Sequence, residues 1–474
     1  MLFRTLRLFL PQKHCSLFYD PDTISSKGDV RPNILQLEPN IDRGTKIMRK
    51  TTYLAAAVVI TQAIAATLPA YGAGFQNSSV STTGIGRANA GSGISGDSIS
   101  DMFANPAGLN LREGREFEAG LHAISLSAPF ENSGSTQTYA GVLTVPAQGA
   151  NSDGGTSSLV PNFYYSAPLS DNLQYGIGLT TPFGLSTEYD STWVGRYAAV
   201  NSELTTLELN PALAYQVSPF VSVGIGLTLL QVDAELTNAQ FIGVGSSDGV
   251  STVKGDDTSI GWTAGLIVGD DQGRFGFSYR SEVQIKPEGE LVVSPLGIRA
   301  GASGSVTLPK TLYFSGMKVL SDKLDLLGSL RHTDWDSFQE LRFKFDNGLP
   351  DDVTPSNWKS TNTYSVGMNY RSSDQWTYRG GLGVDESPVS DQYRTARIPD
   401  TKHKWLSLGM SYKTAGNIRL DLSYAHVLGK DATIGESSDL VSTVPGAAVD
   451  SLSGSYNDSS ADIISFSVSI PLGK

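Results

Sequence analysis

The amino-acid sequence predicts an all-β protein whose strands form one large antiparallel transmembrane β-barrel. Three observations lead to this prediction. Apolar residues alternate with small or polar residues along short segments over most of the chain, as in strands with one lipid-facing and one lumen-facing side. Short polar turns and long connections separate these segments. A stretch typical of a secretory signal precedes them.

The composition excludes a helical membrane protein and argues against a nucleic-acid partner. Glycine accounts for 50 of the 474 residues, and only 17% of the residues are charged. After residue 66, no stretch approaches the roughly 20 apolar residues that a membrane-spanning helix needs. The net charge is −12; residues 1–72 hold nine basic and five acidic residues, which leaves a net charge of −16 for the rest of the chain. The remaining acidic chain repels phosphate backbones, so we expect no binding to nucleic acid.

The start of the chain contains two segments that we do not expect in the mature protein. From Met48 the sequence MRKTTYLAAAVVITQAIAATLPAYG has the basic start, the short apolar run and the small final residues of a signal peptide. We therefore predict a signal peptide at residues 48–72 and a mature protein that begins at Ala73. Residues 1–47 contain four prolines and scattered charges, and we expect them to be an untranslated extension. The single cysteine, Cys15, lies in that extension.

Residues 73–115 are predicted to plug the barrel as an N-terminal hatch. They are rich in Gly, Ser, Asn and Ala and hardly alternate, so they cannot contribute much to a barrel wall. Such a segment must hang in the periplasm or fold into the lumen. We expect the lumen, because an open barrel of this size would leak solutes.

The barrel wall is predicted from residues 116–474. In residues 221–229, for example, Val, Ile and Leu alternate with Ser, Gly and Thr. Short polar turns lie near residues 170–172, 218–220, 270–273, 321–323, 372–375 and 415–417, with long connections between them. This order predicts about 14 strands, with short turns in the periplasm and long loops outside. A soluble β-sandwich or propeller also alternates, but it lacks this regular succession of short and long connections.

Several motifs resemble those of a known protein family. They are AGFQ from Ala73, NPAGL from Asn105, DWDSFQEL from Asp334 and RIPD from Arg397. They resemble the outer-membrane long-chain fatty acid transporters of Gram-negative bacteria, a family that includes related aromatic hydrocarbon channels. The resemblance covers essentially all of residues 73–474. It implies a 14-strand barrel blocked by a hatch, an apolar pocket that the amino terminus enters, and a kinked early strand that opens a lateral gap in the wall.

The same resemblance implies candidate site residues. Phe75 matches the family residue that enters the pocket, and Arg342 falls where the family carries a basic residue implicated in ligand binding. An arginine can hold a carboxylate with two hydrogen bonds. The alternatives are a packing role for Phe75 and an ion pair for Arg342. Asn105 and Pro106 are expected to be structural in the hatch, because an Asn-Pro pair fixes a turn. A second basic position of the family falls near Asp233, an acid, which leaves neutral ligands open.

Two short motifs resemble those of enzymes without their structural context. Residues 91–96 fit G-x-G-x-x-G but follow no predicted strand, and residues 245–249 fit G-x-S-x-G within a long polar loop. The histidines are scattered over the chain. We therefore predict no catalytic residue, no metal site and no cofactor. An outer-membrane lipid hydrolase, a general porin and a surface receptor are the alternatives from other functional classes.

The sequence thus predicts a monomeric protein of the Gram-negative outer membrane that transports long-chain fatty acids or similar hydrophobic compounds. The predicted mechanism is passive, hatch-gated diffusion with lateral exit through the barrel wall into outer-membrane lipid. An apolar path removes about 0.8 kcal/mol of exposure cost per buried methylene, so no energy source is needed for capture. An aromatic or aliphatic hydrocarbon channel is the alternative within the family.

Overall fold

The computed structural model describes residues 73–139, 141–243, 246–439 and 448–473. The predicted extension and signal peptide lie outside the described residues, so both stay predictions. The described helices are short: α2 (Thr82–Ile85), α3 (Asp101–Ala104), η2 (Pro106–Leu111), η3 (Trp335–Ser337) and η4 (Asp391–Tyr393). In the described part of the chain, no helix is long and apolar enough to cross a membrane.

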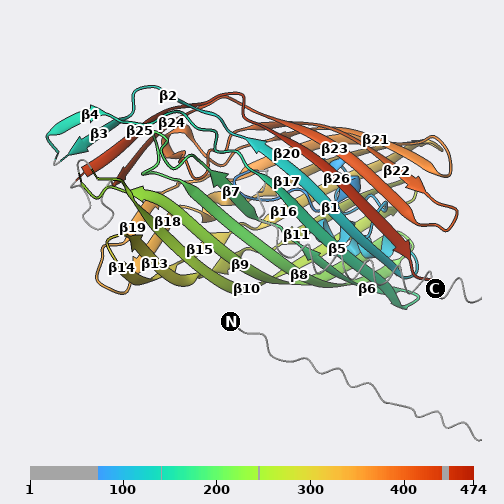
Figure 1. The fold of residues 1–474 in the computed structure, drawn as a ribbon. Helices are drawn as coiled ribbons and strands as arrows, with labels where there is room; N and C mark the ends of the chain where they lie inside the picture. Colours follow the sequence, from blue (N-terminus) through green and yellow to red (C-terminus); the bar gives the residue numbers. More distant parts are fainter. Residues whose placement is uncertain (1–72, 140, 244–245, 440–447, 474) are drawn as a thin grey trace, which may run out of the picture. The chain divides into compact units, whose positions relative to one another are not determined.

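The main sheet closes into an antiparallel barrel of 14 strands, which confirms the predicted fold (Figure 1). Its ring runs β1 (Glu116–Ser127), β5 (Ser157–Ser170), β6 (Leu173–Thr180) with β7 (Gly184–Glu188), β8 (Asn201–Ser218), β9 (Val221–Gln240), β10 (Gly249–Asp270), β11 (Gly273–Arg280), β16 (Thr311–Ser321), β17 (Leu324–Thr333), β20 (Thr361–Arg371), β21 (Trp376–Asp385), β22 (His403–Lys413), β23 (Arg419–Gly429) and β26 (Ser460–Pro471). Here β6 and β7 form one wall strand. The ladder between β1 and β26 closes the ring, pairing Glu116 with Pro471 and Ser127 with Ser460.

The remaining strands lie in the long connections between wall strands. β13 (Glu288–Ser294), β14 (Ile298–Gly304), β18 (Glu340–Phe345) and β19 (Asp352–Pro355) extend the main sheet, and β12 (Val283–Ile285) pairs with β15 (Val306–Leu308). A separate sheet contains β2 (Phe130–Asn132), β3 (Thr136–Tyr139), β4 (Leu143–Pro146), β24 (Ala432–Asp439) and β25 (Ala448–Tyr456). The six predicted short turns all join adjacent wall strands at the opposite end of the barrel (Figure 1). That end is therefore the periplasmic one.

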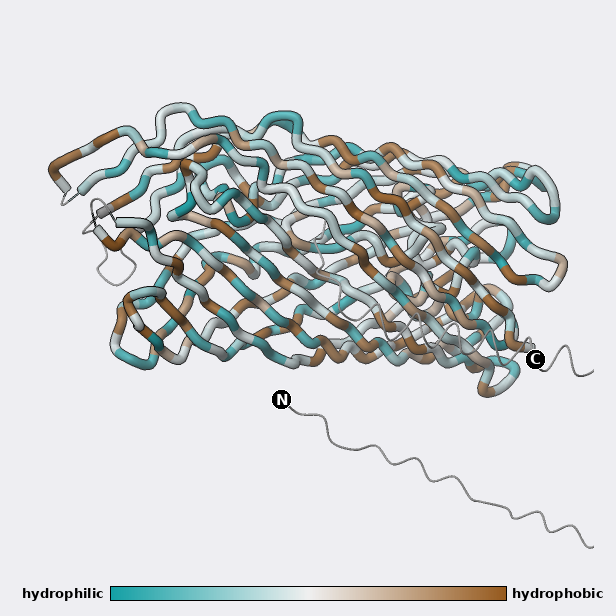
Figure 2. The backbone as a smooth tube through the Cα atoms, viewed as in Figure 1, coloured by the Kyte–Doolittle hydropathy of each residue, from teal (hydrophilic) through white to brown (hydrophobic). Residues whose placement is uncertain are grey.

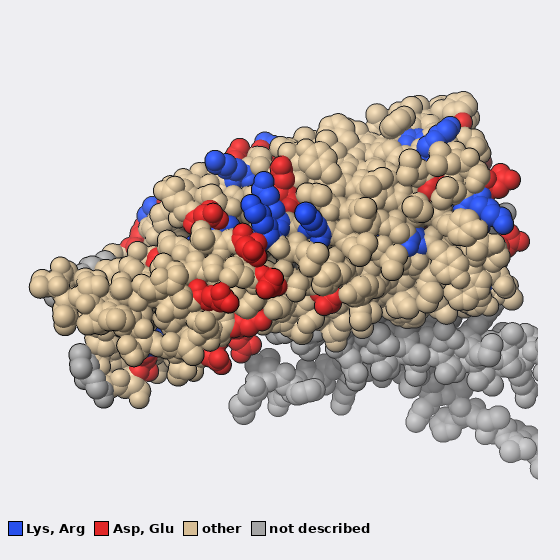
Figure 3. All heavy atoms as spheres, turned by 90° about the horizontal axis from the view of Figure 1, so that it is seen from above, with Lys and Arg blue, Asp and Glu red and all other residues tan. Residues whose placement is uncertain are grey.

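Alternation along the strands separates a lipid-facing surface from the lumen. In β9, Val223, Ile225 and Leu227 are exposed, whereas Ser222 and Thr228, which flank them, are buried. Hydrophobic and hydrophilic residues alternate in the same way along the other wall strands (Figure 2). On the face seen in Figure 3, charged side chains gather in two zones, one left of the middle and one at the right end, and a belt with few charges lies between them. The apolar belt is the part of the wall that fits a bilayer core.

Residues 73–115 lie inside the ring, because they contact inward-facing side chains on opposite parts of it. Ser423 on β23 donates to the backbone oxygen of Thr82 over 2.7 Å, while Asn110 donates to Ser222 on β9 over 2.7 Å. α2 packs on β22, β23, β26 and β1, and η2 packs on β6, β8, β9 and β10. The segment therefore spans the lumen.

Asn105 and Pro106 set the local conformation of this segment. The Asn105 side chain caps η2 by accepting a hydrogen bond from the backbone N–H of Ala107 over 3.0 Å, and Pro106 occupies the first turn, where no N–H is needed. Asn105 also donates to the backbone oxygen of Leu266 on β10 over 3.2 Å. A Cβ at Gly265 would lie 1.9 Å from the Asn105 side-chain oxygen, so glycine is required for this approach.

Candidate functional site

Phe75 fills the centre of an apolar cluster inside the barrel. Its ring centroid lies 6.1 Å from that of Phe183, 4.9 Å from Trp335, 5.8 Å from Phe338 and 5.6 Å from Trp358. We call these four residues the aromatic cage. Aliphatic side chains complete the cluster, namely Leu230, Val232, Val283, Ile285, Leu308 and Val389. Only 4% of Phe75 is exposed, so it is packed like a core residue.

The cluster forms where the lumen-facing side of the wall changes from polar to apolar. Along β9 the buried positions are small or polar up to Thr228 and then become Leu230 and Val232. Over the same stretch the outward positions change from apolar, ending near Leu229, to polar at Gln231. The apolar side of the strand thus switches from lipid to lumen near the outer end of the belt. This switch is the sequence signal that predicts a lumenal pocket.

Residues 73–77, the amino-terminal arm, carry Phe75 into the cluster. The backbone N–H of Ala73 donates to Asp385 over 3.2 Å, and that of Gly74 donates to Asp400 over 3.1 Å. Gln76 forms an isolated antiparallel β-bridge with Phe183. The arm is therefore held by backbone contacts on both sides of the Phe75 ring.

The third wall strand is interrupted beside the arm. β8 pairs with both halves of this strand: Thr180 pairs with Glu208, and Gly184 pairs with Thr205. Residues 181–183 therefore oppose only residues 206–207 of β8. This arrangement is a bulge that bends the strand. β5 pairs with β6 only from Phe163 onward, and among the described pairings none joins β5 to β7. The wall therefore lacks a ladder between residues 157–162 of β5 and β7.

The arm supplies hydrogen-bond partners to the interrupted strand. The N–H of Gly184 donates to the backbone oxygen of Phe75 over 2.9 Å, and the N–H of Asn77 donates to that of Pro182 over 2.8 Å. The Asn77 side chain donates to the backbone oxygen of Thr181 over 2.8 Å. Since unpaired backbone groups are costly inside a membrane, the arm stabilises the interruption in this state.

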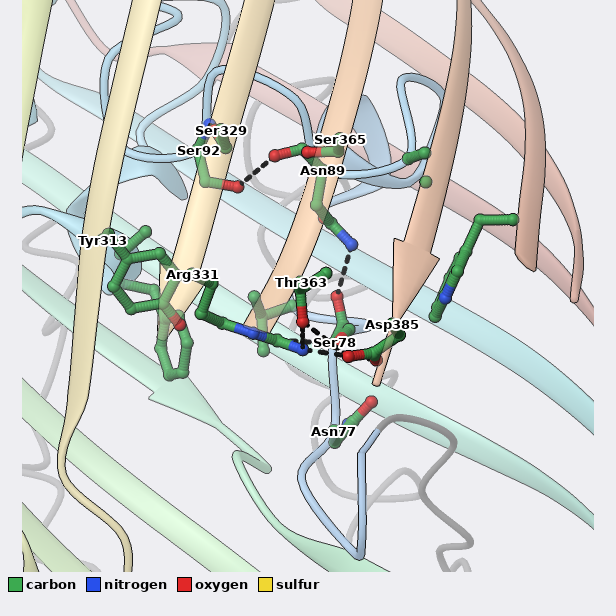
Figure 4. Close-up of a pocket in the computed structure, with 16 residues that line it drawn as sticks. Asn77, Ser78, Asn89, Ser92, Tyr313, Ser329, Arg331, Thr363, Ser365 and Asp385 are labelled. Atoms are coloured by element: carbon green, nitrogen blue, oxygen red, sulfur yellow. Dashed lines mark hydrogen bonds and ion pairs between the residues drawn. The ribbon is translucent and has the colours of Figure 1, made fainter. Parts of the chain in front are cut away.

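A small cavity next to the arm contains a buried arginine (Figure 4). Arg331 donates to Ser78 and to Thr363 over 2.9 Å each, and its guanidinium lies 3.5 Å from Asp385. The cavity has a volume of about 50 Å³. This volume holds a few water molecules but no long alkyl chain.

Arg342 and Arg397 have different hydrogen-bond partners. Arg342 lies on β18 with 37% of its side chain exposed and forms ion pairs with Glu340 over 2.6 Å and Asp351 over 2.9 Å. Arg397 instead donates to the Ser202 hydroxyl over 3.1 Å and to two backbone oxygens over 3.2 and 3.3 Å. These acceptors are neutral. Ile398, the next residue, packs against the apolar cluster. Arg397 therefore places a charge at the edge of the cluster, and the nearby carboxylates of Glu436 and Asp352 attract that charge.

We expect docking of the arm to depend on pH through Asp400, whose carboxyl accepts a hydrogen bond from the Gly74 N–H. Burial raises the pKa of this carboxyl to about 8, against an ordinary value of about 3.9. At a pH between these two pKa values, the Asp400 carboxyl is protonated when the arm is docked and ionised when the arm is undocked and the carboxyl is solvated. Docking is strongest at low pH and weakens as the pH rises toward 8.

We expect Asp400→Asn to remove this pH dependence, because the amide does not titrate. Fluorescence of Trp335 and Trp358, which contact Phe75, reports docking of the arm. Titration of the purified barrel from pH 4 to pH 9 should change this signal in the wild type and leave it flat in the variant. Equal titration curves for both proteins would assign the effect to another group.

Comparisons with known proteins agree with this architecture. A family model described as "Outer membrane protein transport protein (OMPP1/FadL/TodX)" matches residues 62–470. Outer membrane protein P1 of Haemophilus influenzae is 29% identical over 399 residues, 76% of this chain and 86% of that protein. The long-chain fatty acid transport protein of Escherichia coli K12 is 26% identical over 433 residues, covering 82% and 95%.

Two solved structures share the fold. The crystal structure of a Pseudomonas aeruginosa FadL homologue has a TM-score of 0.76 at 22% identity and covers 84% of this chain and 100% of that one. The toluene transporter TodX of P. putida has a TM-score of 0.62 at 17% identity and covers 86% and 100%. Taken with the match over residues 62–470, the closed barrel shows that this chain belongs to the OMPP1/FadL/TodX family of outer-membrane transport proteins.

Proposed function

We propose that this protein carries long-chain fatty acids or similar lipophilic compounds across the outer membrane by passive diffusion, gated by its amino-terminal arm. One observation carries the proposal. The arm places Phe75 in the aromatic cage and, through the same few residues, hydrogen-bonds the interrupted wall strand. The same segment, the arm, therefore fills the cage and closes the wall. The family relationship supports the class of ligand.

The first step is an exchange of Phe75 for the ligand. Burying one Phe side chain is worth about 1.5–3 kcal/mol, whereas an alkyl chain gains about 0.8 kcal/mol per buried methylene. A chain of about a dozen methylenes therefore outcompetes the Phe75 ring for the cage. A compound with few carbons competes much less well, so the cage favours long or bulky apolar molecules.

The second step is opening of the wall toward lipid. When Phe75 leaves, the arm no longer supplies partners to Thr181, Pro182 and Gly184. The region between β5 and β7 then loses its inner cover. A ligand bound inside gains an exit whose next environment is hydrocarbon, so no transfer into water is required. Return of Phe75 to the cage completes the cycle.

The rest of residues 73–115 is anchored more firmly than the arm. Arg379 of β21 forms an ion pair with Asp97 over 3.4 Å, and Arg419 of β23 donates to the backbone oxygen of Asp97. Breaking a buried ion pair costs several kcal/mol, so these contacts hold the segment while the arm moves. We propose that this segment acts as a hatch that stays in place.

The conductance of the purified protein separates this proposal from a general porin. A hatch that stays in place should keep the barrel nearly silent in a planar lipid bilayer, with and without fatty acid. Deleting residues 78–112 should produce large, steady ion currents through the same wall. Steady porin-like currents through the intact protein would contradict the proposal.

For acidic ligands, we propose that Arg397 holds the carboxylate. Replacing Arg397 with Gln removes a charge-assisted contact and should weaken binding of a fatty acid by about 1.5–3 kcal/mol, or roughly ten- to a hundredfold. The methyl ester of the same acid should bind almost as before. Burial lowers the pKa of the Arg397 guanidinium, but the group stays charged. Isothermal titration of both proteins with both ligands measures the difference in binding.

Arg342→Gln is the matched control, because Arg342 is the position that the family pattern suggests. Its two carboxylate partners are already in place, so we expect a much smaller change in acid binding. If Arg342→Gln weakens acid binding and Arg397→Gln does not, the carboxylate is held at β18 instead. If neither substitution distinguishes acid from ester, the transported compounds are neutral hydrocarbons.

A further inference from the structure

The lipid-facing wall carries a groove across β11, β16 and β17. Two adjoining pockets form it, with volumes of about 400 Å³ and 410 Å³, and they share Phe275, Phe314 and Gly316. Both volumes fall within the roughly 300–1,000 Å³ typical of small-ligand sites. The groove lies on the outer surface of the barrel and is separate from the pocket around Phe75.

The floor of the groove is a pair of glycines. Gly316 and Gly328 are direct cross-strand partners. Both occupy outward positions; Gly316, for example, lies between the buried residues Ser315 and Met317. A Cβ at Gly328 would meet nothing nearer than a backbone oxygen at 3.6 Å, so packing within the wall does not require glycine there. Glycine inside a strand often marks the close approach of another molecule.

The sides of the groove are large apolar side chains. Phe275 is 75% exposed, and Phe314, Leu326 and Val366 also point outward. The Phe275 ring borders Gly316, where an added Cβ would meet it at 3.2 Å, and the space over Gly328 is open between Leu326 and Val366. The result is a channel of the width of a side chain along an apolar surface, a shape that suits one extended hydrocarbon chain.

The groove has a cation at its periplasmic end. Lys318 lines the same pocket and faces outward, two residues beyond Gly316 toward the short turn. It pairs in register with Gly273, the first residue of β11, and therefore lies at the membrane boundary. The adjoining turn carries two acids: Asp271 pairs with Arg274, and Asp270 accepts hydrogen bonds from the backbone N–H groups of Gln272 and Gly273. The Lys318 ammonium is thus placed where the headgroups of the inner leaflet lie.

We propose that this groove binds one phospholipid of the inner leaflet, with an acyl chain over Gly316 and Gly328 and its phosphate on Lys318. Hydrocarbon surrounds the wall in any case, so affinity comes from van der Waals packing of the chain and from charge attraction at the headgroup. An apolar groove that ends in a cation matches an anionic amphiphile. The site is independent of the compound that the barrel transports.

Native mass spectrometry of the full-length mature barrel tests the proposal. The protein is exchanged into detergent with equal amounts of phosphatidylglycerol and phosphatidylcholine. We expect one tightly retained lipid, with phosphatidylglycerol preferred. Lys318→Gln should lower the retention of phosphatidylglycerol roughly fivefold and abolish the preference. Gly328→Leu, which fills the groove, should remove the retained lipid.

Gly380→Leu is the matched control, because Gly380 is an outward wall glycine with open space around it, its nearest neighbours lying 4.0 Å from an added Cβ. This variant should retain the lipid as the wild type does. If Gly328→Leu does not fold, Lys318→Gln alone decides, because it leaves the groove unchanged in shape. Equal retention of both lipids by wild type and Lys318→Gln would overturn the proposal. A dimer without bound lipid would assign the groove to a second copy of the chain.

Discussion

Phe75→Ala is expected to tighten ligand binding and at the same time to slow uptake. In the ligand-free state the Phe75 ring occupies the aromatic cage, so a ligand must displace it. Removing the ring removes a competitor worth about 1.5–3 kcal/mol, which lowers the dissociation constant roughly ten- to a hundredfold. Uptake falls because Phe75 no longer returns to the cage to expel the ligand. Titration of the purified barrel and uptake of labelled oleate by cells measure the two effects.

Two controls make this result specific to Phe75. Phe75→Leu keeps much of the buried apolar volume and should give smaller changes in both measurements. Phe220→Ala removes an exposed ring at a periplasmic turn and should change neither. Surface expression and heat-modifiable migration of all variants must match the wild type, because the arm is not part of the wall. Weaker binding by Phe75→Ala would show that the ring is a fixed wall of the pocket.

Deletion of Pro182 is expected to abolish most of the uptake while leaving the cage occupied by ligand. At the interruption, three residues oppose two of β8, so removing one residue restores a regular strand. A regular strand can pair with β5 along its whole length and close the lateral gap. The ligand then faces water at every other exit, at about 0.8 kcal/mol per methylene, and uptake should fall by roughly tenfold or more.

Pro182→Ala separates the effect of strand length from that of proline itself. It keeps the three-residue interruption, so we expect uptake close to that of the wild type. Binding of the fatty acid should be similar in both variants, because the cage residues other than Phe183 lie on different elements. If the deletion variant assembles and transports at the normal rate, the ligand leaves the barrel by another route.

Local sequence patterns were sufficient to predict the wall. Each strand alternates independently of its neighbours, and each short turn is marked by residues within it, as at Ser170–Leu173 and Ser321–Leu324. The lack of alternation in residues 73–115 predicted that they lie outside the wall, and the leak expected from an open barrel favoured the lumen. These features depend on near neighbours in the sequence, which is why the fold could be predicted.

The cage and the carboxylate site could not be derived in the same way. Phe75, Phe183, Trp335 and Trp358 are far apart in sequence and meet only because the arm, an interrupted strand and two long connections converge at one level of the barrel. Phe75 was predicted through family resemblance, not through periodicity. The ligand role of Arg342 came from the same resemblance and stays a prediction; in this structure its guanidinium pairs with Glu340 and Asp351. The change of the apolar side of β9 from lipid to lumen at Leu229 and Leu230 was visible in the sequence and indicates the position of the cage.

The most direct test of the account is to tie the arm to the wall reversibly. Gln76 and Phe183 form an antiparallel β-bridge, and residues paired in this way lie roughly 4.5–5.5 Å apart at Cα, a spacing that suits a disulfide. The only natural cysteine, Cys15, precedes the predicted mature start. Uptake by cells carrying Gln76→Cys and Phe183→Cys is measured before and after reduction, with both single variants as controls. The account predicts that the oxidised protein is blocked and that reduction restores uptake to the level of the single variants. Equal uptake in the two states, with the disulfide verified by mass, would show that transport does not require the arm to leave the wall.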